Sequence, residues 1–182
     1  MVRPKEFERA EVLDKAIEVF WRKGFADTSL HDLEVSTGVN KSGLYSEFKD
    51  KDDIFAQSLK RYRETNPALA ILERTPLGRK NLEDFLLAGQ NCSGLRGCFI
   101  ANSVREISIL SPSAKRQILQ HIELVRAAVL QNVKAATSSS NSAAIADIMM
   151  VYSSGLALQA NLAADRDSSF QTQMLLQSLL GQ

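Results

Sequence analysis

A short stretch near the N-terminus carries hydrogen-bonding side chains at a regular helical spacing. Within residues 40–48, which read NKSGLYSEF, successive side chains of a helix project about 100° apart. Leu44 and Phe48 therefore share an inward-facing side, and Ser42 and Ser46 point directly away from it. The outward face is small and polar, so the backbone of this helix can come close to a flat partner.

Two longer side chains, Lys41 and Tyr45, flank this polar face. An ammonium and a phenol at its edges can reach phosphate oxygens, which line the major groove of double-stranded DNA on walls roughly 12 Å apart. A short solvated amphipathic helix has the same polar face. This alternative does not explain the tight glycine turn that precedes the stretch, so the pattern predicts contact with DNA.

The elements that must position this face form a helix-turn-helix. From about residue 7 to 23, apolar residues recur at helical spacing, and Gly24 stands where a helix C-terminus favours a left-handed residue. A second helix begins near Thr28 and Ser29, whose hydroxyls can cap its free amides. It must end at Gly38, because glycine reaches positive φ without steric cost. Two short helices joined this tightly, and braced by a long first helix, are typical of DNA-binding domains.

Residues 15–55, KAIEVFWRKGFADTSLHDLEVSTGVNKSGLYSEFKDKDDIF, resemble the DNA-binding segment of the TetR/AcrR family of transcriptional regulators. The shared positions include Gly24-Phe25, the Thr37-Gly38-Val39 turn and Leu44-Tyr45, and the likeness covers roughly the first third of the chain. It implies that Lys51, which opens a fourth helix, touches a phosphate. The candidate DNA-binding residues are Thr28, Ser29, Asn40, Lys41, Ser42, Gly43, Tyr45, Ser46 and Lys51.

Two residues of the second helix depart from the family pattern. Glu34 stands where the family has a small or apolar residue facing the recognition helix, and an unpaired carboxylate would be costly to bury there. Val35 is apolar where a polar residue is usual, and a small rotation of the helix would exchange the two. The basic arm of the family is reduced here to Arg3, Lys5 and Arg9.

The remainder of the chain also reads as helical, which predicts an all-α fold. Breaks at residues 66–67 and 75–78 separate it from the DNA-reading part. We expect residues 1–50 to form the helix-turn-helix DNA-binding domain and residues 51–65 to form a connecting helix. Residues 66–182 are expected to form a helical ligand-binding and dimerisation domain.

Two helices near the C-terminus, residues 143–163 and 168–180, are apolar on more than one side. Such helices are buried on two sides, either inside a large core or against a second subunit. The family resemblance implies the second arrangement, a homodimer. Two-fold symmetry then predicts a near-palindromic operator with half-site centres about 34 Å apart, or a somewhat longer distance compatible with the groove repeat. Aspartate at Leu158 or Leu176 is expected to break this interface.

The resemblance also implies that the second domain encloses a cavity for a small-molecule effector of unknown identity. Asn102 and Arg105 stand out, because polar groups among apolar neighbours either need partners or supply them to a ligand. An ordinary core or surface position is the alternative for each candidate. His121 is expected on the surface. The candidate ligand-binding residues are Phe85, Phe99, Asn102, Arg105, Ile122, Met149 and Tyr152.

The charge balance does not by itself indicate a nucleic-acid partner. The net charge is +1, and residues 1–65 hold twelve Lys and Arg against thirteen Asp and Glu. DNA binding must therefore depend on local arrangement, and residues 35–46 contain one lysine and no acid. A charged N-terminus and the lack of a long apolar run predict a cytoplasmic protein without a membrane partner.

Catalytic and metal-binding signatures are missing from the sequence. Cys92 and Cys98 have no histidine near them, so they are interpreted as small buried hydrophobic residues, with no metal or cofactor. No phosphate-binding glycine loop or paired-carboxylate pattern supports an enzyme.

The expected function is a homodimeric DNA-binding repressor released by a small molecule. The alternative is a DNA-binding regulator that responds to a protein partner or lacks a small-molecule pocket, and a second domain without a cavity would favour it.

Overall fold

The computed structural model describes residues 7–88, 91–92, 95–162 and 167–181. The basic-arm residues Arg3 and Lys5 lie outside these ranges. The chain forms two compact units, of which the first contains residues 102–119 in addition to the N-terminal segment. Their ranges are Met1–Thr65 with Asn102–Leu119 for unit 1, and Asn66–Ala101 with Gln120–Gln182 for unit 2.

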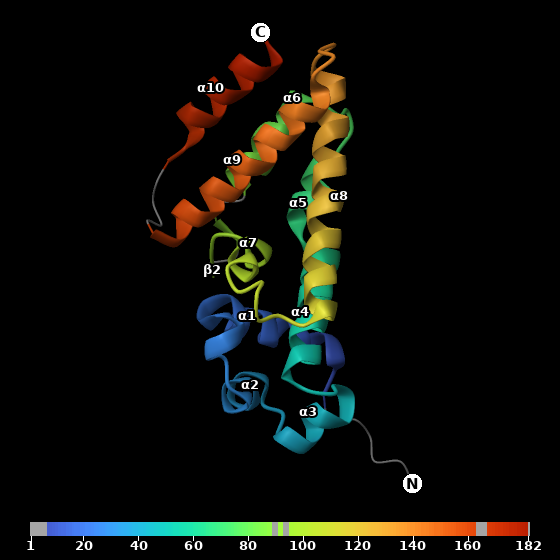
Figure 1. Cartoon of the computed structure of the whole chain (residues 1–182), viewed down its shortest axis with the longest axis vertical. Coiled ribbons are helices and arrows are strands. Elements are labelled where there is room, and N and C mark those ends of the chain that lie inside the picture. Colours follow the sequence, from blue (N-terminus) through green and yellow to red (C-terminus); the bar gives the residue numbers. More distant parts are fainter. Residues whose placement is uncertain (1–6, 89–90, 93–94, 163–166, 182) are drawn as a thin grey trace. The chain divides into compact units, whose positions relative to one another are not determined.

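Helices make up most of the described residues, which confirms the all-α fold class (Figure 1). A single two-residue antiparallel pair, in which Asn91 is opposite Arg96, interrupts them. The elements are α1 (Arg9–Asp27), α2 (Leu30–Thr37), α3 (Lys41–Glu47), α4 (Lys51–Thr65), α5 (Pro67–Leu72), α6 (Arg79–Ala88), β1 (Asn91–Cys92), β2 (Leu95–Arg96), α7 (Phe99–Val104), α8 (Pro112–Ala136), α9 (Ser142–Leu162) and α10 (Ser169–Leu180).

The first helix is broken where glycine was expected to end it. Gly24 has φ +83° and ψ 171°, which is not helical, and the helix resumes for one further turn to Asp27. Side chains other than glycine rarely adopt this backbone conformation. The break turns Phe25 back into the core, where its ring lies 5.0 Å from that of Phe55 on α4. Phe20 meets the same Phe55 ring edge-on at 4.9 Å, so an aromatic cluster joins α1 to α4.

Capping interactions fix both short helices of the helix-turn-helix. Ser29 accepts a hydrogen bond from the Asp32 amide, and the Asp32 carboxylate accepts one from the Ser29 amide, which is a complete capping box. Gly38 ends α2 in the left-handed conformation with φ +73°. Asn40 then caps α3 by accepting from the Gly43 amide at 2.8 Å. All of these bonds join residues close in sequence, which is why they were predictable.

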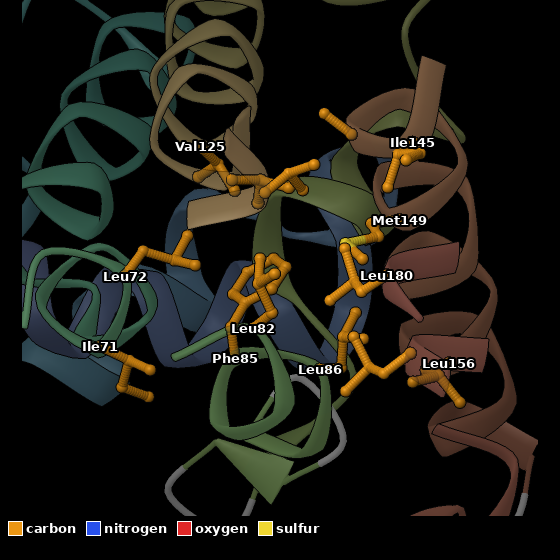
Figure 2. Close-up of a cluster of buried hydrophobic side chains, with 14 residues drawn as sticks. Ile71, Leu72, Leu82, Phe85, Leu86, Val125, Ile145, Met149, Leu156 and Leu180 are labelled. Atoms are coloured by element: carbon orange, nitrogen blue, oxygen red, sulfur yellow. The ribbon is translucent and has the colours of Figure 1, made fainter. Parts of the chain in front are cut away.

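Unit 2 is held by a cluster of buried aliphatic and aromatic side chains (Figure 2). Leu82, Phe85 and Leu86 of α6 pack in this cluster with Val125 of α8 and Met149 of α9. Helix α8 begins at Pro112, and the preceding Ser111 hydroxyl accepts a hydrogen bond from the Ala114 amide.

A buried asparagine pair links the chain between α5 and α6 to α8. Asn132 is fully buried, and its amide donates to the carbonyls of Leu72 and Ala128. Its oxygen accepts from the Gly78 amide at 2.9 Å and from Asn81 at 3.0 Å. Every hydrogen-bonding group of this buried amide side chain therefore has a partner, as burial requires.

Helix α9 has two different apolar sides. Ala146 and Met149 are buried in the core of unit 2. A second row of exposed apolar side chains follows a spacing of three, seven and four residues, which keeps it on one face of the helix. This exposed stripe consists of Ile148, Val151, Leu158 and Leu162. Among the described helices, α9 alone is long and apolar enough to cross a bilayer by length and composition.

Candidate nucleic-acid interface

Helix α3 presents the small polar face that the sequence predicts. Leu44 and Phe48 are buried, whereas Ser42, Tyr45 and Ser46 are exposed. The Ser46 hydroxyl donates to the Gly43 carbonyl at 2.7 Å, so its oxygen can still accept hydrogen bonds. The α3 face can therefore approach a partner closely and offer hydroxyl groups to it.

Gly43 is required by packing inside unit 1. A Cβ atom at this position would lie 2.7 Å from Cγ1 of Val39, which is closer than real side chains approach. Val39 is buried between the turn and α3. The small residue at position 43 thus lets α3 pack against its own turn, whatever lies on the outer face.

Glu34 departs from the family pattern and has a definite role in the structure. Its Oε1 atom accepts a hydrogen bond from the Lys41 amide at the start of α3. Val35 projects outward and is 70% exposed, so no rotation of α2 exchanges the two residues. A carboxylate at a helix N-terminus is favourable, because the free amides there carry partial positive charge. Glu34 therefore fixes α2 against the recognition helix and is not a buried unpaired charge.

Two of the candidate DNA-binding residues face the interior of unit 1. Thr28 is 1% exposed, and its hydroxyl donates to the Gly24 carbonyl at 2.6 Å. The Lys51 ammonium donates to the carbonyls of Phe25 and Thr28, both at 2.9 Å, and lies 4.4 Å from the centre of the Phe25 ring. Both side chains stabilise the turn between α1 and α2. The Thr28 side chain is thus buried away from a partner, and the half-buried Lys51 has a structural role in addition to the phosphate contact predicted from sequence.

The sequence match to known proteins lies over this same part of the chain. Residues 12–57 match the family described as Bacterial regulatory proteins, tetR family. HTH-type transcriptional repressor ComR of Escherichia coli (strain K12) is 35% identical over 114 residues, which cover 58% of this chain and 54% of ComR. Residues 12–57 of this chain therefore form a segment of the TetR-family type. It spans about half the length of the curated relatives that it matches.

Solved structures of TetR-family regulators share the fold over nearly the whole chain. Reduced Escherichia coli NemR superimposes with a TM-score of 0.81 at 18% identity, covering 93% of this chain and 95% of NemR. A cysteine mutant of CifR, solved with 26bp double-strand operator DNA, gives a TM-score of 0.72 at 20% identity and covers 98% of both chains. At such identities the comparison establishes the fold. The relatives named here are regulators and not enzymes.

A contact between residues far apart in the sequence was missed by sequence reasoning. Glu106, in the turn that follows α7, accepts hydrogen bonds from the amides of Phe25 at 2.6 Å and Ala26 at 2.8 Å. These amides begin the last turn of α1, directly after the break at Gly24. The carboxylate of Glu106 therefore caps that turn from a position 81 residues away along the chain. No local sequence signal could have indicated it.

Most basic side chains near the α3 face are occupied by contacts within unit 1. Arg9 donates to the Glu47 carbonyl at 3.1 Å and lies over the Phe48 ring, so it ties α1 to α3. Lys23 binds Asp32 at 2.5 Å. This bond, together with those from the Ser29 amide and hydroxyl, holds the pKa of Asp32 well below its ordinary value. Arg9 and Lys23 therefore serve contacts within unit 1.

The seven candidate ligand-binding residues lie in different surroundings. Phe85 and Met149 belong to the packed core cluster of unit 2, and Phe99 is also buried. Ile122 and Tyr152 are half-buried, and the Tyr152 hydroxyl lies 3.3 Å from that of Thr172.

The two polar candidates belong to unit 1, in which Asn102 is half-buried and Arg105 is exposed. His121 was wrongly expected on the surface, because its side chain is buried. Of the cysteines, Cys98 is half-buried, and the side chain of Cys92 lies outside the described residues.

A half-open hollow of about 360 Å³ in unit 2 has none of the seven candidates in its walls. It is lined by Leu72, Glu73, Thr75, Leu77, Ala128 and Gln131.

Proposed function

We propose that this chain is a homodimeric, sequence-specific DNA-binding transcriptional regulator, a repressor that a small-molecule ligand releases from a near-palindromic operator. The observation that carries the proposal is the exposed small polar face of α3, fixed at both ends by capping interactions and by Glu34. The partner is duplex DNA in the cytoplasm.

The edges and the centre of the α3 face are suited to different contacts with DNA. Lys41 and Tyr45 at its edges bind phosphates, and the Lys41 ammonium already lies 5.8 Å from the Tyr45 ring, which keeps the two together. Ser42 and Ser46 at its centre approach base edges. Phosphate contacts set the register, and base-edge contacts supply the sequence preference. Asn40 and Gly43 support this arrangement by starting the helix and permitting its close packing.

Dimerisation is supported by the exposed stripe of α9. Val151 and Leu162 are 74% and 81% exposed, and on α10 Phe170 and Met174 are exposed as well. An apolar surface of this kind, on the two helices nearest the C-terminus, is stabilised by burial against a second copy over more than about 1,000 Å². A two-fold dimer presents two α3 helices to half-sites about 34 Å apart, or a longer spacing compatible with the groove repeat. Residues 143–163 and 168–180 thus remain our proposed interface.

One residue that the sequence assigns to the interface must be replaced. Leu176 is 1% exposed and packs in the core of unit 2, so it is not available to a partner. Leu158 is half exposed and belongs to the stripe. Aspartate at position 158 therefore tests dimerisation, whereas aspartate at position 176 tests folding.

The function is tested by selecting bound sequences from a pool of random double-stranded DNA with the purified full chain. We expect an enriched near-palindromic motif, protection of two half-sites on one face of the duplex, and a dimer by sedimentation. Failure to enrich any motif, or full operator affinity by a stable monomer, would contradict the proposal. Thermal-shift screening of metabolites, followed by operator titration with each hit, tests release by a ligand, and hits that leave operator affinity unchanged would contradict this part.

A further inference from the structure

We infer that Lys49 contacts DNA phosphate beyond the C-terminal end of the recognition helix, on the groove wall opposite the one reached by Lys41. This inference rests on the proposed function and concerns which residues anchor the α3 face. The lysine at position 51, which the family resemblance selects, is bonded inside unit 1. Lys49 was not among the candidates from sequence.

The ammonium of Lys51 is held on three sides. It donates to two main-chain carbonyls, Phe25 O and Thr28 O, and lies over the face of the Phe25 ring. Two of its three N–H donors are therefore committed to the carbonyls of the turn between α1 and α2. A phosphate contact that moved the ammonium away from these carbonyls would remove the bonds that close this turn.

The ammonium of Lys49, unlike that of Lys51, is not bonded inside unit 1. Its backbone is fixed, because the preceding Phe48 is buried and its own amide donates to Asp53 Oδ2 at 3.1 Å. Its side chain is exposed, and within the described residues its ammonium has no hydrogen bond or ion pair. The neighbouring carboxylates of Asp50 and Asp53 are engaged as acceptors at the start of α4. Lys49 is thus an unengaged cation on a rigid segment.

The positions of Lys41 and Lys49 match the width of a major groove. From residue 41 to residue 47 the helix rises about 9 Å. The extended residues that follow, beginning with Phe48 at φ −130° and ψ 141°, add at most about 7 Å. The two lysines therefore bracket α3 over a span of roughly 9 to 16 Å, against a groove of roughly 12 Å. One cation at each end of the helix can then meet a different phosphate strand.

The consequence is measurable as counterion release. Each phosphate neutralised by a lysine contributes about 0.9 to the slope of log affinity against log salt concentration. Between 50 and 200 mM salt, one contact per protomer corresponds to roughly a 3.5-fold change in affinity. Because the proposed regulator is a dimer, loss of Lys49 should lower the slope by about 1.8 for each bound dimer.

The test compares Lys49→Ala, Lys49→Arg, Lys51→Ala and the control Lys60→Ala in the full-length protein, with a random-sequence duplex as probe. Lys60 is an exposed lysine on α4, 3.9 Å from Glu64, so its removal changes net charge equally. We expect Lys49→Ala to lower the salt slope by about 1.8 per dimer, Lys49→Arg to retain it, and Lys60→Ala to leave it unchanged. Lys51→Ala should lower the melting temperature, because it removes two hydrogen bonds that close the turn between α1 and α2.

A wild-type slope in Lys49→Ala, when the wild-type protein binds DNA, would overturn the inference and leave the proposed function standing. Absence of salt-dependent DNA binding by the wild-type chain would overturn the proposed function and this inference together.

Discussion

Substitution of Gly24 by alanine should destabilise unit 1 through two separable effects. The first is backbone strain, because φ +83° with ψ 171° is a conformation that is essentially restricted to glycine and costs other residues about 1 to 3 kcal/mol. The second is steric, because a Cβ atom at this position would lie 2.9 Å from Oε2 of Glu106. The carboxylate must then move away from the amides of Phe25 and Ala26.

The magnitude follows from those two contributions. Losing two hydrogen bonds to a half-exposed carboxylate costs about 1 kcal/mol each, so Gly24→Ala should lower the free energy of unfolding by about 3 to 5 kcal/mol in all. Glu106→Ala alone should cost about 2 kcal/mol. In the double variant only the backbone strain is added to that loss, so the two substitutions should couple by about 2 kcal/mol.

Urea unfolding of the wild-type protein, the two single variants and the double variant measures this coupling directly. Gly38→Ala is a matched control, because Gly38 also has positive φ but nothing lies within 4 Å of the place that a Cβ atom would occupy. It should show strain only and no coupling to Glu106→Ala. Additivity of Gly24→Ala and Glu106→Ala to within about 0.5 kcal/mol would refute the role assigned to Glu106.

Three further outcomes are expected. Leu158→Asp should give a folded monomer by sedimentation and circular dichroism, whereas Leu176→Asp should unfold unit 2; a dimeric Leu158→Asp protein would contradict the proposed interface. The pKa of Asp32 is lower in the folded state than in the unfolded state. The ionised carboxylate therefore stabilises the fold fully above about pH 4, and this stabilisation is lost as the pH falls. The melting temperatures of Asp32→Asn and the wild-type protein should accordingly converge in acid. Asn132→Leu should lower the free energy of unfolding by about 2 to 4 kcal/mol in urea titrations, because it leaves buried partners unbonded; a loss below about 1 kcal/mol would count against the asparagine pair.

The helix-turn-helix could be predicted from sequence because short-range interactions define it. The Ser29 cap with Asp32, the left-handed Gly38 and the start of α3 at Asn40 all involve residues within four positions of one another. Helical periodicity likewise placed Leu44 in the core, because a seven-residue helix leaves little freedom in which side faces inward. These features determine the candidate DNA-binding face.

The apolar periodicity of α9 and α10 predicted only part of how these helices are buried. It indicated that both helices are apolar on two sides, but not which side the chain itself buries. Leu158 and Leu176 were therefore treated alike, although one belongs to the exposed stripe and the other to the core. His121 was misplaced for the same reason. Burial depends on which helices pack together, and that is a long-range property.

By itself, then, the sequence determined the helices, their caps and the polar face of α3, since each follows from the spacing of neighbouring residues. Only the tertiary structure decided which main-chain groups the charged side chains of unit 1 bind. Lys51 is drawn to carbonyls 23 and 26 residues away, and Glu106 caps amides 80 and 81 residues away. Charged side chains bind whichever main-chain groups folding leaves unpaired near them, and those groups are known only once the distant segments are packed.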